Sequence, residues 1–153
     1  MSKTILTFFF LALLTTSIFG QDKYLDRGNQ FLNDGNLDSA EQTFRNAIKA
    51  NPKNLIYQNQ LGLVLIEEKK FEEAEIILDK VLKTDSTNVA AIWYSGIGNF
   101  KSKKYRLAIM RFEKSLMLLD KNSGQYYSAN WFIGKSYSNL LKTEGLTYSE
   151  TDR

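Results

Sequence analysis

Residues 54–88 read NLIYQNQLGLVLIEEKKFEEAEIILDKVLKTDSTN and decide the fold, because they hold two apolar stripes at helical spacing. The first stripe runs through Leu61 and Leu65, before the charged residues 67–70. The second stripe lies at Phe71, Ala74, Leu78 and Val81. Apolar residues at steps of three or four lie on one face of a helix. The stretch therefore predicts two antiparallel helices joined by a short turn.

The same pattern recurs on both sides of this stretch at an offset of 34 residues. Three columns each keep one residue type at that offset: Gly28, Gly62 and Gly96; Ala40, Ala74 and Ala108; and Asn54, Asn88 and Asn122. A fixed period of this length indicates a solenoid, in which each unit buries its apolar face against its neighbours. The glycines suit a close helix crossing, and we expect the alanines to sit opposite them.

The ends of the units also carry helix signals. Asn51-Pro52 closes the first unit, because proline disfavours helix in the residue before it. Residues 85–88, Asp-Ser-Thr-Asn, supply capping groups at the same junction one unit later.

The first unit resembles the tetratricopeptide repeat in nearly every signature column: Tyr24, Gly28, Phe31, Gly35, Leu37, Ala40, Phe44, Ala47 and Pro52. The later units depart from the pattern, with Ser86 and Asp120 for the proline, Lys69 and Lys103 for the turn glycine, and Asn99 for an aromatic residue or leucine. The resemblance covers residues 21–122 and implies an all-α fold, a right-handed α-solenoid of three helix-turn-helix repeats with a C-terminal capping helix.

The repeat register divides the chain into segments. We predict repeats at residues 21–54, 55–88 and 89–122, a capping helix or partial fourth repeat at 123–142, and a polar tail at 143–153. Trp131, Gly134 and Tyr137 echo the first helix of a unit, but Gly134 follows Gly96 by 38 residues, so residues 120–126 carry a four-residue insertion.

Residues 1–20, MSKTILTFFFLALLTTSIFG, have the layout of a secretory signal peptide. Basic Lys3 precedes an uncharged apolar run, and Gly20 is a small residue at the expected cleavage point. The alternative is a retained membrane anchor, which needs about 20 apolar residues, and this run is shorter. We therefore expect export to the periplasm or cell envelope, with secretion as an alternative, and no integral membrane span after cleavage.

The composition disfavours an enzyme. The 153 residues include no cysteine and no histidine, which removes thiol nucleophiles, thiolate and imidazole metal ligands, and the commonest general base. We predict no catalytic, cofactor-binding or metal-binding residues. The net charge of +3 gives no strong attraction to nucleic acid.

Two charged runs stand out locally: the basic run Lys101, Lys103, Lys104, Arg106, Arg111 and Lys114, and the acidic run Glu67, Glu68, Glu72, Glu73 and Glu75. They lie at equivalent turns of neighbouring units. We interpret them as solvated surfaces that compensate each other, and we do not predict nucleic-acid binding.

In this family the first helix of each unit lines a concave groove, and the resemblance implies the same here. The groove residues predicted to bind a partner are Asn29, Asn59, Gln60, Leu63, Trp93, Tyr94, Ile97 and Trp131. Amide side chains could bond an extended peptide, and Trp93 and Tyr94 could hold an apolar anchor. The alternative for Trp93 and Trp131 is packing against the adjoining helix.

One known use of the family is a clamp for the C-terminal carboxylate of heat-shock chaperones, which needs lysines, asparagines and an arginine in five groove columns. Those columns hold Leu25, Asn29, Gln60, Ala90 and Tyr94 here, so only Asn29 matches and every cation is missing. The expected function is an exported scaffold that binds a protein or peptide in its groove. The alternatives are a structural subunit that binds through its ends or convex face, and a small-ligand or envelope-polymer binder that uses Trp93 and Trp131.

Overall fold

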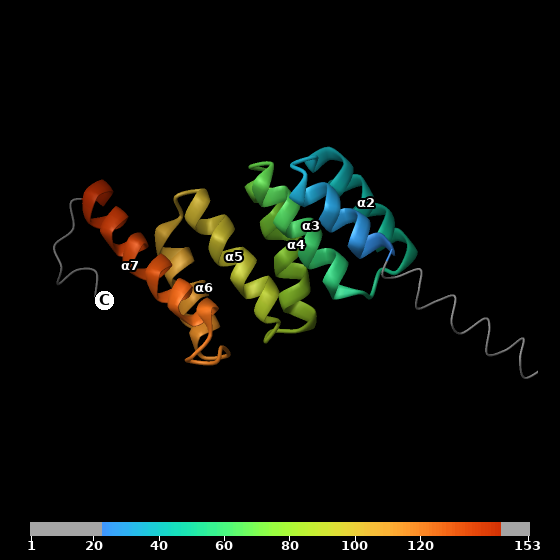
Figure 1. Ribbon diagram of the computed structural model, residues 1–153. Helices are drawn as coiled ribbons and strands as arrows, with labels where there is room; N and C mark the ends of the chain where they lie inside the picture. The colour runs from blue at the N-terminus through green and yellow to red at the C-terminus, as the bar shows by residue number, and fades with distance from the viewer. Residues whose placement is uncertain (1–22, 145–153) are drawn as a thin grey trace, which may run out of the picture.

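The computed structural model describes residues 23–144, and this part of the chain is helical without strands (Figure 1). Residues 23–33 are helical, and α2 (Leu37–Ala50), α3 (Leu55–Glu67), α4 (Phe71–Thr84), α5 (Val89–Lys101), α6 (Tyr105–Leu116) and α7 (Gly124–Glu144) follow. The predicted signal peptide, residues 1–20, and the segment 145–153 lie outside the described residues. None of the helices in 23–144 is apolar over a length that could cross a membrane.

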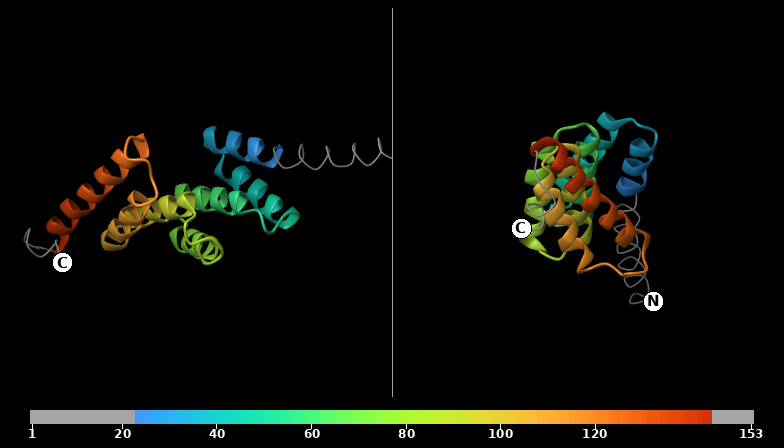
Figure 2. Two further views of the ribbon diagram at one scale, coloured as in Figure 1. Left: turned by 90° about the horizontal axis from the view of Figure 1, so that it is seen from below. Right: turned by 90° about the vertical axis from the view of Figure 1, so that its left-hand side faces the viewer.

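The helices form hairpins that stack side by side into an arch. The helix at 23–33, α3, α5 and α7 form the inner layer, and α2, α4 and α6 form the outer layer. Figure 2 shows the helix at 23–33 and α7 rising on one side of the array, with α4 on the opposite side. The all-α array of helical hairpins predicted from the 34-residue period is confirmed.

The glycine column marks where the two helices of each hairpin cross. A Cβ atom at Gly62 would lie 2.6 Å from Leu78, one at Gly96 would lie 2.9 Å from Phe112, and one at Gly28 would overlap Phe44. The nearest side chains therefore belong to the column of large apolar residues. The alanine column, Ala40, Ala74 and Ala108, is also buried and lies four residues before these large side chains on the same helices.

Asparagines cap the inner helices at two of the three predicted junctions. Asn54 Oδ1 accepts a hydrogen bond from the backbone N–H of Ile56, and Asn88 Oδ1 accepts one from Ala91. The third residue of the column, Asn122, does not cap α7. Ser123 Oγ takes that place and accepts from Tyr126 N–H, because the insertion before α7 shifts the start of the helix.

The turn within each hairpin has one backbone geometry, whatever its sequence. Gly35, Lys69 and Lys103 have φ values of 72°, 63° and 64°, in the left-handed region. The next residue in each case donates its N–H to a carbonyl five residues earlier, at 2.8 Å. This is the Schellman closure of a helix, which favours glycine at the left-handed position. The two lysines therefore occupy a strained conformation.

Lys69→Gly is expected to raise the free energy of unfolding by about 0.5–1 kcal/mol, because glycine adopts positive φ without a Cβ clash. Urea denaturation followed by circular dichroism measures the change. Lys69→Ala removes the same charge and keeps the Cβ, so it serves as the control and should give no comparable gain. Equal stability of the two variants would mean that the charge, not the backbone, sets the effect.

Asn99 differs from the family pattern, and the end of α7 differs from the predicted segments. Asn99 is buried, and its Nδ2 donates to the carbonyl of Ser95 at 2.8 Å, so a bond within α5 satisfies the polar side chain. Helix α7 extends through Thr143 and Glu144, two residues that the sequence had placed in the tail.

Candidate functional site

The concave face carries a line of polar side chains that joins three inner helices. Tyr94 donates its hydroxyl to Gln60 Oε1 at 3.4 Å, and Gln60 Nε2 donates to Asn29 Oδ1 at 2.5 Å. All three side chains are half-buried. Burial raises the pKa of the Tyr94 hydroxyl, so it remains a neutral donor at neutral pH. The floor of this face is therefore polar, uncharged and already hydrogen-bonded.

Apolar side chains flank this polar line. Leu63 and Ile97 are half-buried and occupy the column of Asn29, one and two repeats later. Ile56, absent from the eight predicted groove residues, is 55% exposed on α3. A hollow of about 420 Å³ opens beside Leu63; Leu32, Gly35, Leu37 and Glu67 also line it. Aliphatic surface is thus available next to the polar line.

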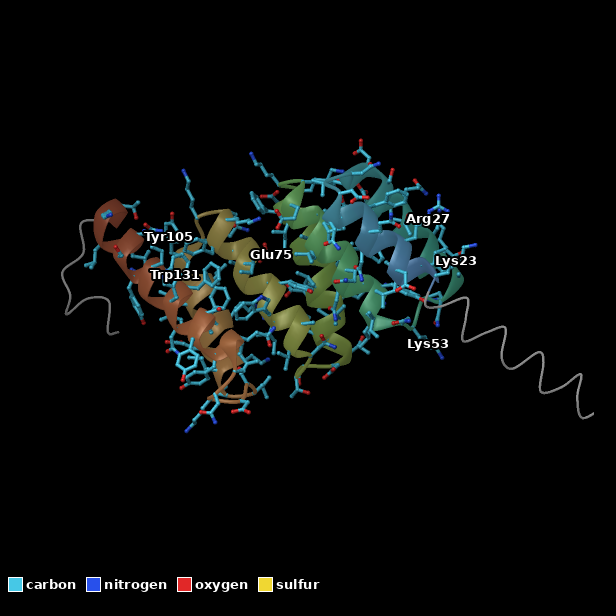
Figure 3. All side chains as sticks on the ribbon, viewed as in Figure 1. Lys23, Arg27, Lys53, Glu75, Tyr105 and Trp131 are labelled. Atoms are coloured by element: carbon cyan, nitrogen blue, oxygen red, sulfur yellow. The ribbon has the colours of Figure 1, made fainter. Side chains whose placement is uncertain are left out.

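Trp131 is the largest exposed side chain on α7, with 59% of its surface accessible. Its ring lies 5.0 Å from the Phe132 ring and 6.4 Å from the ring of Phe100 in α5. Figure 3 shows Trp131 on the side of α7 that faces α5. It therefore borders the concave face and keeps most of its surface free for a contact.

Of the predicted contact residues, Asn59 is buried, whereas Trp93 is half-buried and packs against two neighbouring helices. Asn59 is 6% exposed and donates to Asn88 Oδ1 at 2.9 Å, so it braces the cap of the next inner helix. The Trp93 ring meets Phe112 edge-on at 5.3 Å and Phe132 at 6.2 Å. Trp93 thus packs between α6 and α7, as the alternative interpretation had it.

Ion pairs between neighbouring repeats connect the two charged runs. Lys101 pairs with Glu67 at 2.7 Å, and Lys104 pairs with Glu75 at 2.9 Å. These contacts confirm that the two runs compensate each other. The Lys104–Glu75 pair repeats the pair between Lys70 and Glu41 one unit earlier, at 2.7 Å. The hydrogen bond from Lys70 is the main cause that lowers the pKa of Glu41 to about 2.

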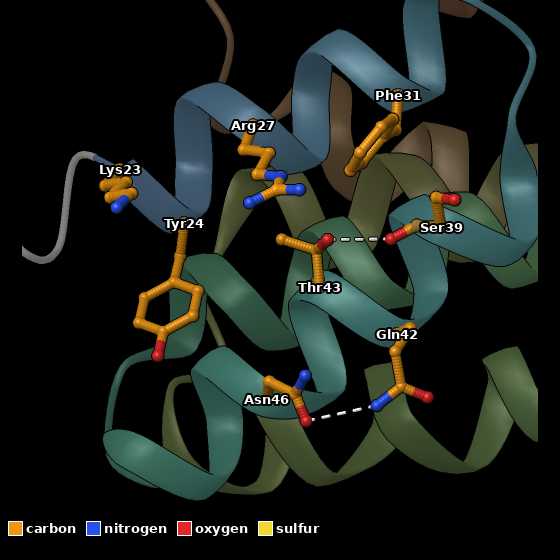
Figure 4. A pocket seen from close by; sticks show the side chains of 8 residues that line it. All are labelled: Lys23, Tyr24, Arg27, Phe31, Ser39, Gln42, Thr43 and Asn46. Atoms are coloured by element: carbon orange, nitrogen blue, oxygen red, sulfur yellow. Dashed lines mark hydrogen bonds between the residues drawn. The ribbon is translucent and has the colours of Figure 1, made fainter.

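A second hollow, of about 630 Å³, lies at the N-terminal end of the array, between the helix at 23–33 and α2 (Figure 4). Its lining is Lys23, Tyr24, Arg27, Phe31, Ser39, Gln42, Thr43 and Asn46. Several of these side chains already have partners within the lining. Thr43 Oγ1 donates to the Ser39 carbonyl, Gln42 Nε2 donates to Asn46 Oδ1, and Arg27 lies 5.4 Å from the centre of the Phe31 ring. The lining of this hollow comes from the helix at 23–33 and from α2, and includes none of the residues of the polar line.

The chain is similar to proteins of known family and known structure. Residues 31–94 match the family model of the tetratricopeptide repeat. The fold is that of a tetratricopeptide repeat domain. Three solved domains are similar in structure to this chain, and the similarity extends over most of the length of each domain. The Arabidopsis OM64 TPR domain has a TM-score of 0.66 at 23% identity, covering 75% of this chain and 94% of that one.

The other two solved domains were determined in complexes, one with pHsp70 and one with an HSP70 peptide. The TPR2B domain of yeast Sti1, in a pHsp70 complex, has a TM-score of 0.71 at 15% identity and covers 78% of this chain and 97% of that one. The second TPR domain of human RPAP3, in complex with the HSP70 peptide SGPTIEEVD, has a TM-score of 0.64 at 24% identity, with 74% and 92% covered.

One curated relative is also similar in sequence to part of this chain. It is the Hsp70-Hsp90 organising protein of Plasmodium falciparum (isolate 3D7), 30% identical over 103 residues. The match covers 63% of this chain, and the chain spans only 18% of that relative's length.

Proposed function

We propose that this chain is a non-enzymatic scaffold that binds a protein or peptide partner on its concave face. The observation that carries the proposal is the pairing of an uncharged, hydrogen-bonded floor at Asn29, Gln60 and Tyr94 with exposed apolar surface at Ile56 and Trp131. Apolar anchors beside a polar strip are the usual composition of a protein-binding surface.

The likeness to the yeast and human domains supports protein binding, but the floor of this face differs from a carboxylate clamp. The five clamp columns hold Leu25, Asn29, Gln60, Ala90 and Tyr94, so no lysine or arginine is present in them. A negatively charged C-terminal tail would be desolvated there without a counter-charge, which is costly. The partner segment is therefore an uncharged or apolar stretch of chain.

Alanine substitutions of exposed apolar residues on the two faces of the array test whether the concave face binds the partner. Ile56→Ala and Trp131→Ala are expected to weaken binding of an affinity-captured, purified partner by about 1 kcal/mol or more each, the scale of an interface contact. Isothermal titration calorimetry measures the change. Ile76→Ala, at a site 70% exposed on α4 of the outer layer, is the matched control and should leave the affinity unchanged. Unchanged melting temperatures verify the fold.

The alternative function is a structural subunit that contacts its complex through the convex face or the ends. The observation in its favour is a pair of exposed apolar residues in one column of the outer helices, Ile76 on α4 and Met110 on α6. In that case the result reverses: Ile76→Ala and Met110→Ala weaken binding, and Ile56→Ala and Trp131→Ala do not. That outcome would replace the concave-face proposal.

We also propose that the scaffold works outside the cytoplasm, in the periplasm or cell envelope. The support is the signal-peptide layout of residues 1–20. N-terminal sequencing of the protein recovered from an envelope fraction is expected to begin at or near Gln21. Recovery of intact Met1 in the membrane pellet would instead identify residues 1–20 as an anchor.

A further inference from the structure

The hollow between the helix at 23–33 and α2 has two cations at positions where the next repeat has buried residues. Lys23 precedes Tyr57 by one 34-residue repeat, and Tyr57 is 2% exposed. Arg27 precedes Leu61 by the same interval, and Leu61 is also 2% exposed. Burying a lysine or arginine without a counter-charge is costly. This surface is therefore unsuited to the apolar packing that joins one repeat to the next.

The positive charge of this hollow has no counter-charge in its lining. The eight lining residues include Lys23 and Arg27 but no aspartate or glutamate. Within residues 23–144, neither cation forms an ion pair. In contrast, Lys70, Lys101 and Lys104 each pair with a glutamate of the preceding repeat. The hollow is thus electropositive, whereas the basic residues between repeats are neutralised.

The polar groups of the lining are mainly hydrogen-bond donors. The ammonium of Lys23 and the guanidinium of Arg27 donate and cannot accept. The hydrogen bond from Gln42 Nε2 uses the side-chain oxygen of Asn46 and leaves Asn46 Nδ2 free to donate. The Ser39 hydroxyl can donate as well. Charged donors form shorter and stronger hydrogen bonds with carboxylates than neutral donors do.

Aromatic surface borders these donors. Figure 4 shows the Arg27 side chain between those of Tyr24 and Phe31, pointing toward α2. The guanidinium lies 5.4 Å from the centre of the Phe31 ring, a contact that leaves its N–H groups available. Tyr24 is 36% exposed. The hollow, of about 630 Å³, therefore combines positive charge with ring surface in a space large enough for several side chains.

We propose that this hollow binds an acidic segment of a partner protein, in which carboxylates flank an apolar side chain. The carboxylates pair with Lys23 and Arg27, and the apolar side chain lies against Tyr24. Charge complementarity selects this occupant, because a packed apolar surface would bury both cations without a counter-charge. The site is separate from the concave face, where the floor is uncharged, and the proposal does not depend on it.

An acidic peptide and its uncharged isostere test the proposal. A pentapeptide Asp-Glu-Phe-Asp-Glu, capped at both ends, is titrated into the ¹⁵N-labelled full chain, and amide shifts are followed by NMR. Shifts are expected within residues 23–31 and 39–46, and the capped control Asn-Gln-Phe-Asn-Gln should give none. Arg27→Gln should weaken binding roughly tenfold or more, because it removes charge-assisted hydrogen bonds. Lys53→Gln is the matched control and should bind normally, since Lys53 is an exposed cation at the same end but outside the lining (Figure 3).

Four results would overturn the proposal. Equal binding of the uncharged peptide would mean that ring surface, and not charge, attracts the ligand. Inorganic phosphate that binds as tightly as the acidic peptide would identify a site for small anions. Shifts centred on Gln60 and Tyr94 that persist in Arg27→Gln would place the acidic segment on the concave face instead. No shifts within residues 23–46 would mean that Lys23 and Arg27 only keep this end of the array solvated.

Discussion

Phe112→Ala is expected to lower the free energy of unfolding by about 3–5 kcal/mol, the range for loss of a large buried aromatic side chain. Phe112 has no accessible surface, fills the space above Gly96, stacks on Phe132 at an interplanar angle of 7°, and meets Trp93 edge-on. Truncation therefore opens a cavity at the point where α5, α6 and α7 meet. Urea denaturation followed by circular dichroism measures the loss.

Met110 lies on the same helix and provides the control for this experiment. Because Met110 is 51% exposed, Met110→Ala is expected to change stability by less than about 0.5 kcal/mol. A loss below about 1 kcal/mol for Phe112→Ala would mean that α6 does not hold α5 and α7 together in the register described.

Two glycine-to-alanine substitutions are expected to change stability in opposite directions. Gly62→Ala should lower the free energy of unfolding by about 1–3 kcal/mol, because its Cβ would lie 2.6 Å from Leu78 in a packed core. Gly134→Ala should raise it by about 0.5–1 kcal/mol, because its Cβ meets no atom and alanine is the better helix former.

Each of these variants is the control for the other, since the chemical change is the same. Thermal and urea denaturation of both should show the opposite signs, and the difference isolates the contact from the helix propensity. Stabilisation by both substitutions would show that the Leu78 side chain moves aside at little cost, and that the glycine column reflects something other than close crossing.

The repeat period predicted the hairpins well because the contacts that form them are local. Gly62 and Leu78 are 16 residues apart, and the same spacing recurs for Gly28 with Phe44 and Gly96 with Phe112. A column that keeps one residue type over three units therefore reports one contact made three times. The turns were also predictable in position, although Lys69 and Lys103 conceal the left-handed conformation that glycine would have revealed.

The concave face was harder to predict, because neighbouring positions on one helix differ in exposure for reasons that the period does not contain. Asn59 and Gln60 are adjacent amides, yet Asn59 is buried against the cap at Asn88 while Gln60 joins the line to Asn29 and Tyr94. Trp93 could serve as an anchor or as core, since both roles need a large aromatic ring, and in the structure it packs on Phe112 and Phe132 while it stays half-buried.

The repeat register places Ile56 on the groove side, but Ile56 was not among the residues predicted to bind a partner, and it is 55% exposed. It lies in the first turn of the helix, two residues after the capping Asn54. Sequence reasoning ranked polar and aromatic groove residues above an isolated aliphatic one.

The contacts between successive repeats, here called joints, differ along the array. Ion pairs occur at the first two joints and stacked aromatic rings at the third, so ionic strength affects the joints differently. The first two joints carry the repeated ion pairs Glu41–Lys70 and Glu75–Lys104. The equivalent positions at the third joint are Ile109 and Lys142, which cannot form this ion pair, and stacked Phe112 and Phe132 hold α7 there instead. Added salt screens exposed ion pairs but strengthens apolar association. Added salt is therefore expected to weaken the ion-pair contribution at the first two joints and to leave the aromatic stacking at the third joint intact.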